Sequence, residues 1–113
     1  MAAYNATPWI RPDSVDSVAT GVLGGRPPRL NDLVRLIKET DGRAVGVSEE
    51  SIILWQSRLA KLEGIFVEPT SATVLGALEK LVKSKVISPD ETVLVPFTAY
   101  GGKEPIPANR TLI

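Results

Sequence analysis

The sequence predicts an α/β domain with a small, partly parallel sheet flanked by about three main helices. Amphipathic stretches alternate with short apolar, β-branched stretches in the order helix, strand, helix, short strand, helix, strand. Such alternation favours parallel strands joined by crossover helices over an all-helical bundle. The length of 113 residues and the 43% hydrophobic content leave room for one small core.

The first predicted helix opens at Pro28 and is ended by Gly42. Its apolar residues recur at helical spacing, with charged residues between them: Leu30, Leu33, Val34 and Ile37. The preceding residues, 1–29, are rich in proline and glycine and therefore predict a strap with at most one short helix, over Val15 to Leu23. After the helix, the short and partly β-branched residues 43–47 predict the first strand.

The second predicted helix follows at once. Ser48 is a good N-cap, and the carboxylates of Glu49 and Glu50 complement the positive end of the helix dipole. Gly64 ends the helix. One apolar stripe is predicted to lie in the core: Ile52, Trp55, Leu59 and Leu62.

The third predicted helix opens at Pro69, after a short linking strand over residues 65–67. Its apolar face consists of Val74, Leu75, Leu78, Leu81 and Val82. The last strand, Thr92 to Val95, is apolar enough to be buried on both faces, which so small a sheet can scarcely achieve. The predicted α/β core therefore covers residues 30–105, precedes a proline-containing tail over residues 106–113, and reads as part of a larger fold.

Composition excludes several classes of function. Thirteen basic and thirteen acidic residues cancel, so neither nucleic acid nor a membrane surface is an expected partner. The absence of cysteine and histidine excludes disulfides, thiolate or imidazole metal sites and the usual catalytic triads, so no metal is expected. Because the chain shows neither a membrane-spanning apolar run nor a signal-peptide pattern, we expect a cytoplasmic location.

Three places carry candidate chemistry. The glycines and cation of residues 101–103 follow a strand and are compatible with a phosphate site, or with an ordinary strand-exit turn. Glu68, Thr70 and Ser71 gather at a helix start, where they either meet a ligand or simply cap the helix. Thr98 ends the apolar strand, the position where open parallel sheets place ligand contacts.

Taken together, three stretches resemble the C-terminal part of the threonine synthases, which are fold-type-II pyridoxal-phosphate enzymes. They are the strand and helix start of residues 42–50, the block Glu-Gly-Ile-Phe-Val-Glu-Pro-Thr-Ser-Ala of residues 63–72, and the turn Thr-Ala-Tyr-Gly-Gly-Lys of residues 98–103. In that family a Glu-Gly-Ile-Phe segment leads to Glu-Pro-x-Ser-Ala, and an apolar strand runs into Thr-Gly-x-Gly-x-Lys. The order and the spacing fit from about Asp16 to Pro105.

The resemblance implies a cofactor, pyridoxal 5'-phosphate, and a place for three residues beside it. Thr98 would face the pyridine nitrogen, Glu68 would lie near the ring side of the pocket, and Ala99 would stand where the family has glycine. A neutral hydroxyl at that nitrogen keeps the ring a weaker electron sink than a carboxylate would. The family's reaction, a lyase-type conversion of O-phospho-L-homoserine and water into L-threonine and phosphate, needs neither imidazole nor thiol.

The same resemblance implies an incomplete site. None of the six lysines lies in the family's Schiff-base motif, and no glycine-rich loop for the cofactor phosphate is present. The isolated chain is therefore predicted to be inactive, with no catalytic residue of its own, and to need the missing N-terminal part of the enzyme or self-association. The alternatives are a fragment of a sister enzyme of the threonine dehydratase or cysteate-forming type, and a non-catalytic module that binds a small ligand.

Overall fold

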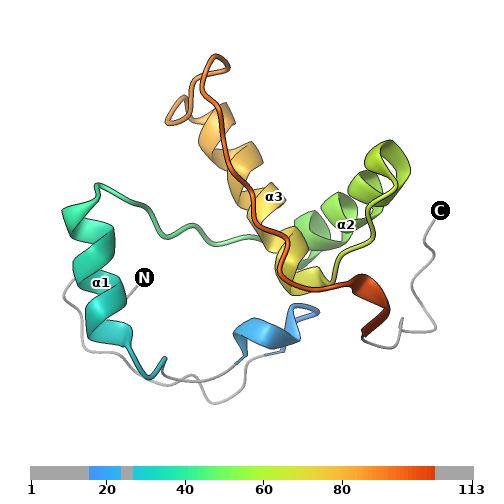
Figure 1. The fold of residues 1–113 in the computed structure, drawn as a ribbon, viewed down its shortest axis with the longest axis horizontal. Coiled ribbons are helices and arrows are strands. Elements are labelled where there is room, and N and C mark those ends of the chain that lie inside the picture. Colours follow the sequence, from blue (N-terminus) through green and yellow to red (C-terminus); the bar gives the residue numbers. More distant parts are fainter. Residues whose placement is uncertain (1–15, 24–26, 104–113) are drawn as a thin grey trace. The chain divides into compact units, whose positions relative to one another are not determined.

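The computed structural model describes residues 16–23 and 27–103 (Figure 1). These residues fall into two compact units, of which one holds residues 16, 23 and 27–46 and the other holds residues 17–22 and 47–103. The predicted tail and most of the predicted strap lie outside the described residues. No helix within the described ranges is both long enough and apolar enough to cross a membrane.

The first unit contains helix α1, Leu30–Glu39, which confirms the first predicted helix. The helix ends where Thr40 donates its hydroxyl to the Leu36 carbonyl at 2.8 Å. The Gly42 N–H donates to the Ile37 carbonyl at 2.7 Å, so this glycine closes the last turn. No residue of α1 is buried.

Helix α2, Glu49–Glu63, confirms the second prediction at both ends. The Ser48 hydroxyl accepts the Ser51 N–H at 3.3 Å, which is the expected N-cap. Gly64 has a φ of 68°, the left-handed conformation that glycine adopts without strain.

Helix α3, Pro69–Lys83, starts at the proline as predicted and packs against α2. The core of this second unit is small: Ala19, Ile52, Leu59, Val67 and Ala72 are its buried hydrophobic residues. Figure 1 shows α2 and α3 leaning apart toward their C-terminal ends. The core therefore lies between α2, as far as Leu59, and the beginning of α3.

The prediction that the whole apolar stripe of each helix is buried is wrong at the C-terminal ends of both helices for this reason. Leu62 at the end of α2 is 74% exposed and Val82 at the end of α3 is 41% exposed. Trp55 is only partly buried. An amphipathic helix buries its stripe only where another element covers it, and here the cover ends before the stripes do.

The predicted sheet is not confirmed. The described residues contain no strand, and the pairing they show is one isolated antiparallel bridge between Val67 and Tyr100. Residues 43–47 and 92–98 run without regular structure. A strand exists only through a ladder of hydrogen bonds with a neighbour, and the described part of the chain offers these segments none.

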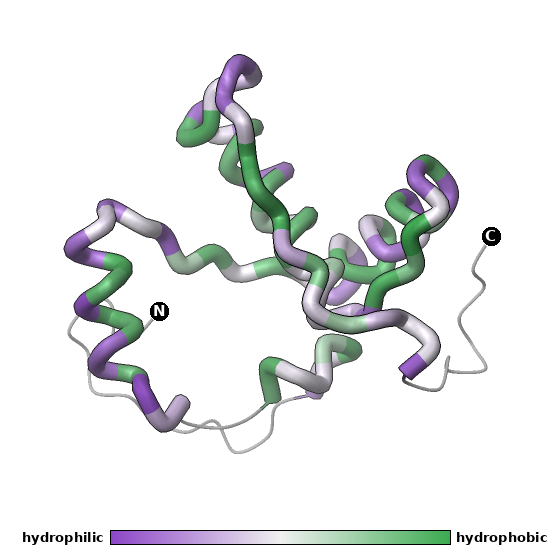
Figure 2. Tube along the Cα trace, in the orientation of Figure 1, coloured by the Kyte–Doolittle hydropathy of each residue, from purple (hydrophilic) through white to green (hydrophobic). Residues whose placement is uncertain are grey.

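The apolar segment 92–95 consequently lies open. Val93 is 41% exposed and Leu94 is 92% exposed, so the expectation that this stretch is buried on both faces is wrong for the chain by itself. Figure 2 shows its apolar colouring along the return from α3. The predicted short helix before residue 23 is also smaller than expected, since its described part holds only the 3-10 turn η1, Thr20–Val22.

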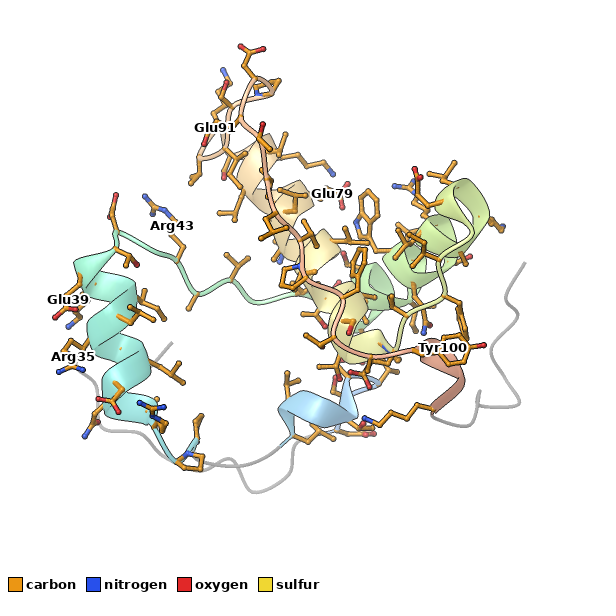
Figure 3. All side chains as sticks on the ribbon, in the orientation of Figure 1. Arg35, Glu39, Arg43, Glu79, Glu91 and Tyr100 are labelled. Atoms are coloured by element: carbon orange, nitrogen blue, oxygen red, sulfur yellow. The ribbon has the colours of Figure 1, made fainter. Side chains whose placement is uncertain are left out.

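Glu79 joins α3 to α2 by its carboxylate (Figure 3). The Trp55 indole N–H donates to Glu79 Oε2 at 2.9 Å, and Lys83 Nζ lies 2.6 Å from Glu79 Oε1. The hydrogen bond from Lys83, followed by the one from Trp55, lowers the pKa of Glu79 below its ordinary value. Both bonds favour the charged form of the carboxyl group.

We expect Glu79→Gln to lower the melting temperature at neutral pH and to have progressively less effect in acid. A depressed pKa in the folded state contributes stability above the unfolded-state pKa, and this contribution is lost as the pH falls through the lowered value. Thermal melts followed by circular dichroism across that range check the trend. Glu63→Gln, at an exposed residue of α2, is the matched control, and a Glu79→Gln effect that does not vary with pH would contradict the assignment.

Candidate functional site

The candidate site is a junction of two chain segments just before the first turn of α3. The Glu68 N–H donates to the Ala99 carbonyl at 3.1 Å, and the Gly101 N–H donates to the Phe66 carbonyl at 3.0 Å. With the bridge between Val67 and Tyr100, these bonds hold the two segments antiparallel. The junction thus fixes the entry to α3 against the end of the 92–100 segment.

Ser71, in the first turn of α3, contacts the 92–100 segment at the same junction. Its hydroxyl oxygen accepts the N–H groups of Thr98 and Ala99, each at 3.2 Å. The same oxygen lies 3.2 Å from the Thr98 hydroxyl oxygen. Ser71 is buried, whereas Thr98 is exposed. The polar side chain presented outward at this point is therefore that of Thr98.

A third segment, residues 17–22, is attached to the starts of both helices. Ser17 Oγ donates to Glu49 Oε1 at 2.6 Å, and the Val18 N–H donates to Glu49 Oε2 at 2.8 Å. The Gly21 N–H donates to Thr70 Oγ1 at 3.0 Å. Ala19, between these attachments, is fully buried. The segment thus covers the base of the α2 and α3 pair.

The expectation that Thr70 or Ser71 caps the first turn of α3 by a hydrogen bond is wrong. Glu68 occupies the N-cap position but makes no side-chain cap hydrogen bond. Thr70 accepts from Gly21, and Ser71 accepts from residues 98 and 99. The three polar residues therefore serve contacts between segments, and the first turn of α3 is organised by its neighbours.

In residues 101–103, several of the groups that could hold a phosphate are already bonded within the chain. They form the 3-10 turn η2, Gly101–Lys103, whose first N–H is already used by the Phe66 carbonyl. Lys103 Nζ lies 3.7 Å from Glu68 Oε2, so its charge faces the carboxylate of a glutamate whose side chain is only 9% exposed. A free anion would have to compete with that carboxylate. The described residues also bring together no group of side chains that could hold a metal ion.

All three residues expected at the cofactor belong to this one junction. Thr98 and Ala99 contact Ser71, and Glu68 is bonded to Ala99 through its backbone. Sequence reasoning missed Gln56, whose amide donates to the Val67 carbonyl at 2.7 Å from a side chain 3% exposed. Gln56 is a polar residue on the apolar face of α2, and this position could have indicated a buried hydrogen bond.

The chain matches one known protein family over most of its length. Residues 2–99 match the family described as pyridoxal-phosphate dependent enzyme, and because this is most of the sequence, the chain belongs to that family.

Similarity among individual proteins is to threonine synthases. The chain is 39% identical to the threonine synthase of Methanosarcina acetivorans over 105 residues, which are 92% of this chain and 26% of the relative. It is 34% identical to that of Methanocaldococcus jannaschii over 108 residues, which are 96% of this chain and 26% of the relative. The chain thus spans about a quarter of the length of these relatives.

The family's cofactor is pyridoxal phosphate, and the junction fits it at one point. A neutral pyridine nitrogen needs a hydrogen-bond donor, and the exposed residue Thr98 carries a hydroxyl that can donate. Lys103, the cation nearest to the junction, is engaged with Glu68. The described residues therefore suit the ring of the cofactor and offer its phosphate no built site.

Proposed function

We propose that this chain is the C-terminal part of a cytoplasmic, threonine-synthase-like lyase and supplies the ring side of its cofactor pocket. The substrate would be O-phospho-L-homoserine. In the overall reaction the phosphate ester bond to the γ-carbon breaks, and the elements of water are added, giving L-threonine and inorganic phosphate. Pyridoxal phosphate supplies electron withdrawal from the substrate's α-carbon.

The placement of Thr98 is the single observation that carries this proposal. Thr98 is an exposed residue, and the surrounding backbone is held by Ser71 and by the Glu68 to Ala99 bond. A hydroxyl donor leaves a pyridine nitrogen unprotonated, whereas a carboxylate would favour its protonation. Thr98 would therefore bind and orient the ring, and Glu68, buried beside it, would help to close that side of the pocket.

The rest of the pocket would come from another polypeptide segment. Exposed apolar side chains lie over the second unit, among them Leu62, Ile65, Val93 and Leu94. Surfaces of this kind mark sites of association, and an apolar segment without a ladder partner, such as residues 92–95, is suited to pair with a strand. We propose the missing N-terminal part of the enzyme as the partner, bringing the Schiff-base lysine and the phosphate loop.

A hybrid protein tests the proposal. In it, this chain replaces the segment of the Methanosarcina acetivorans threonine synthase that it matches. We expect the folded hybrid to bind pyridoxal phosphate and to release phosphate from O-phospho-L-homoserine, and the isolated chain to do neither. Thr98→Val should weaken cofactor binding by the hybrid, whereas Thr98→Ser should retain it, because only serine keeps the hydroxyl.

Other outcomes would contradict the proposal. A folded hybrid that binds no cofactor would favour a non-catalytic module. A hybrid that binds cofactor but acts on threonine in place of O-phospho-L-homoserine would point to a dehydratase. Phosphate release by the isolated chain would overturn the prediction that the chain is incomplete.

A further inference from the structure

Ser71 makes a set of contacts that only one arrangement of hydrogen atoms satisfies. A serine hydroxyl has one hydrogen to donate and two lone pairs to accept with. Two backbone N–H groups, those of Thr98 and Ala99, point at Ser71 Oγ, each at 3.2 Å. An amide N–H can only donate, so these two bonds occupy both lone pairs of the serine oxygen.

The remaining contact of Ser71 then has a fixed direction. Its oxygen lies 3.2 Å from Thr98 Oγ1, and by distance alone either hydroxyl could be the donor. Since the Ser71 oxygen has no acceptor capacity left, Ser71 must donate and Thr98 must accept. This also satisfies the hydroxyl of Ser71, a residue that is 3% exposed and therefore has little access to water.

The direction of this bond decides what Thr98 offers to a ligand. With one lone pair used by Ser71, the Thr98 oxygen keeps its own hydrogen for an acceptor outside the junction. A neutral pyridine nitrogen is such an acceptor. A protonated ring nitrogen would instead have to donate to Thr98 and would leave the threonine hydrogen unused.

We propose that Ser71 is a positioning residue that sets the Thr98 hydroxyl as a hydrogen-bond donor to the ring nitrogen of pyridoxal phosphate. Ser71 does not touch the cofactor in this proposal. It acts by holding the backbone of residues 98 and 99 and by fixing the polarity of the Thr98 hydroxyl. The proposal rests on the proposed function for the identity of the ligand, but the arrangement of Ser71 is a property of this chain alone.

Amide hydrogen exchange in the isolated chain tests the arrangement. Ser71→Ala should speed exchange at the Thr98 and Ala99 amides by about ten-fold, the effect of losing one hydrogen bond of ordinary strength. Thr98→Val should leave the Ala99 amide protected, because Ser71 still accepts from it. Ser84→Ala, at the exposed serine that ends α3, is the matched control. Unchanged exchange at both amides in Ser71→Ala would overturn the proposal.

The protonation state of the ring nitrogen tests the proposed direction of the hydrogen bond from Thr98. Pyridoxal phosphate labelled with nitrogen-15 in its ring is bound to the hybrid protein, and the nitrogen resonance is followed against pH. We expect an unprotonated, hydrogen-bonded nitrogen with the native sequence and a shifted resonance or titration in Ser71→Ala. A purely structural role for Ser71 would change stability and leave this resonance alone, which would overturn the proposal.

The two measurements separate the failure of this inference from that of the proposed function. If the hybrid binds the cofactor and the ring nitrogen responds to Thr98→Val but not to Ser71→Ala, the role of Ser71 is wrong and the proposed function stands. If the folded hybrid binds no cofactor, the proposed function fails and the cofactor role of Ser71 fails with it. The amide exchange result then describes a purely structural contact.

Discussion

Replacing Gly101 by alanine is expected to destabilise the second unit by about 3 kcal/mol, the upper end of what overpacking costs. A Cβ at this position would lie 2.7 Å from the Val67 carbonyl oxygen and 2.7 Å from two ring carbons of Phe66. The carbonyl belongs to the backbone and cannot swing aside. The Gly101 N–H is also bonded to the Phe66 carbonyl, so moving either segment breaks the junction that holds Thr98.

Denaturant unfolding followed by circular dichroism measures this loss. Gly46→Ala is the matched control, because a Cβ there meets no atom within 4 Å and should change stability by less than about 0.5 kcal/mol. Faster exchange of the Glu68 amide, which donates to Ala99, would localise the damage to the junction. Equal stability losses in the two variants would show that the close approach of Phe66 and Val67 is not the reason why Gly101 tolerates no side chain.

The helices could be predicted because their signals are local. Ser48 caps α2, Gly64 ends it in the left-handed conformation, and Pro69 opens α3. Each signal acts within one turn of its own helix, so no knowledge of distant residues was needed.

The strands could not be confirmed for the opposite reason. The apolar, β-branched composition of residues 92–95 records a preference for a pleated, buried environment. Whether a strand forms depends on a partner that local sequence does not specify, and the described part of this chain contains none for it. Leu94 has the side chain of a buried strand residue, yet it is exposed because no neighbouring strand covers it in the described part of the chain.

The resemblance pointed to residues that meet at this junction, but it did not predict how they contact one another. Thr98, Ala99 and Glu68 were identified through the resemblance of their motifs, and the structure brings all three to one junction. Ser71 looked like a helix cap because a serine at a helix start most often is one. Only the approach of residues 98 and 99, which are 27 and 28 positions away, reveals its other role.

Replacing Gly76 by valine is expected to push α3 away from Val47 and from the start of α2. A Cβ at Gly76 would lie 2.5 Å from Val47 Cγ1 and 2.8 Å from Ser51 Oγ. The serine hydroxyl can rotate away, but the branched valine side chain is stiff about its first torsion. We therefore expect a loss of at least about 2 kcal/mol, larger than any gain from replacing a helical glycine, which is about 1 kcal/mol.

A double-mutant cycle with Val47→Ala assigns the cause, because residues in direct contact do not contribute additively. Removing the Val47 methyl groups opens the space that the new side chain needs. The double variant Gly76→Val/Val47→Ala should therefore lose less stability than the two single variants together, by at least about 1 kcal/mol. Denaturant unfolding measures these losses. Strict additivity would mean that Gly76→Val acts through the α3 backbone alone, so that the absence of a side chain at Gly76 is not what lets the two helices meet.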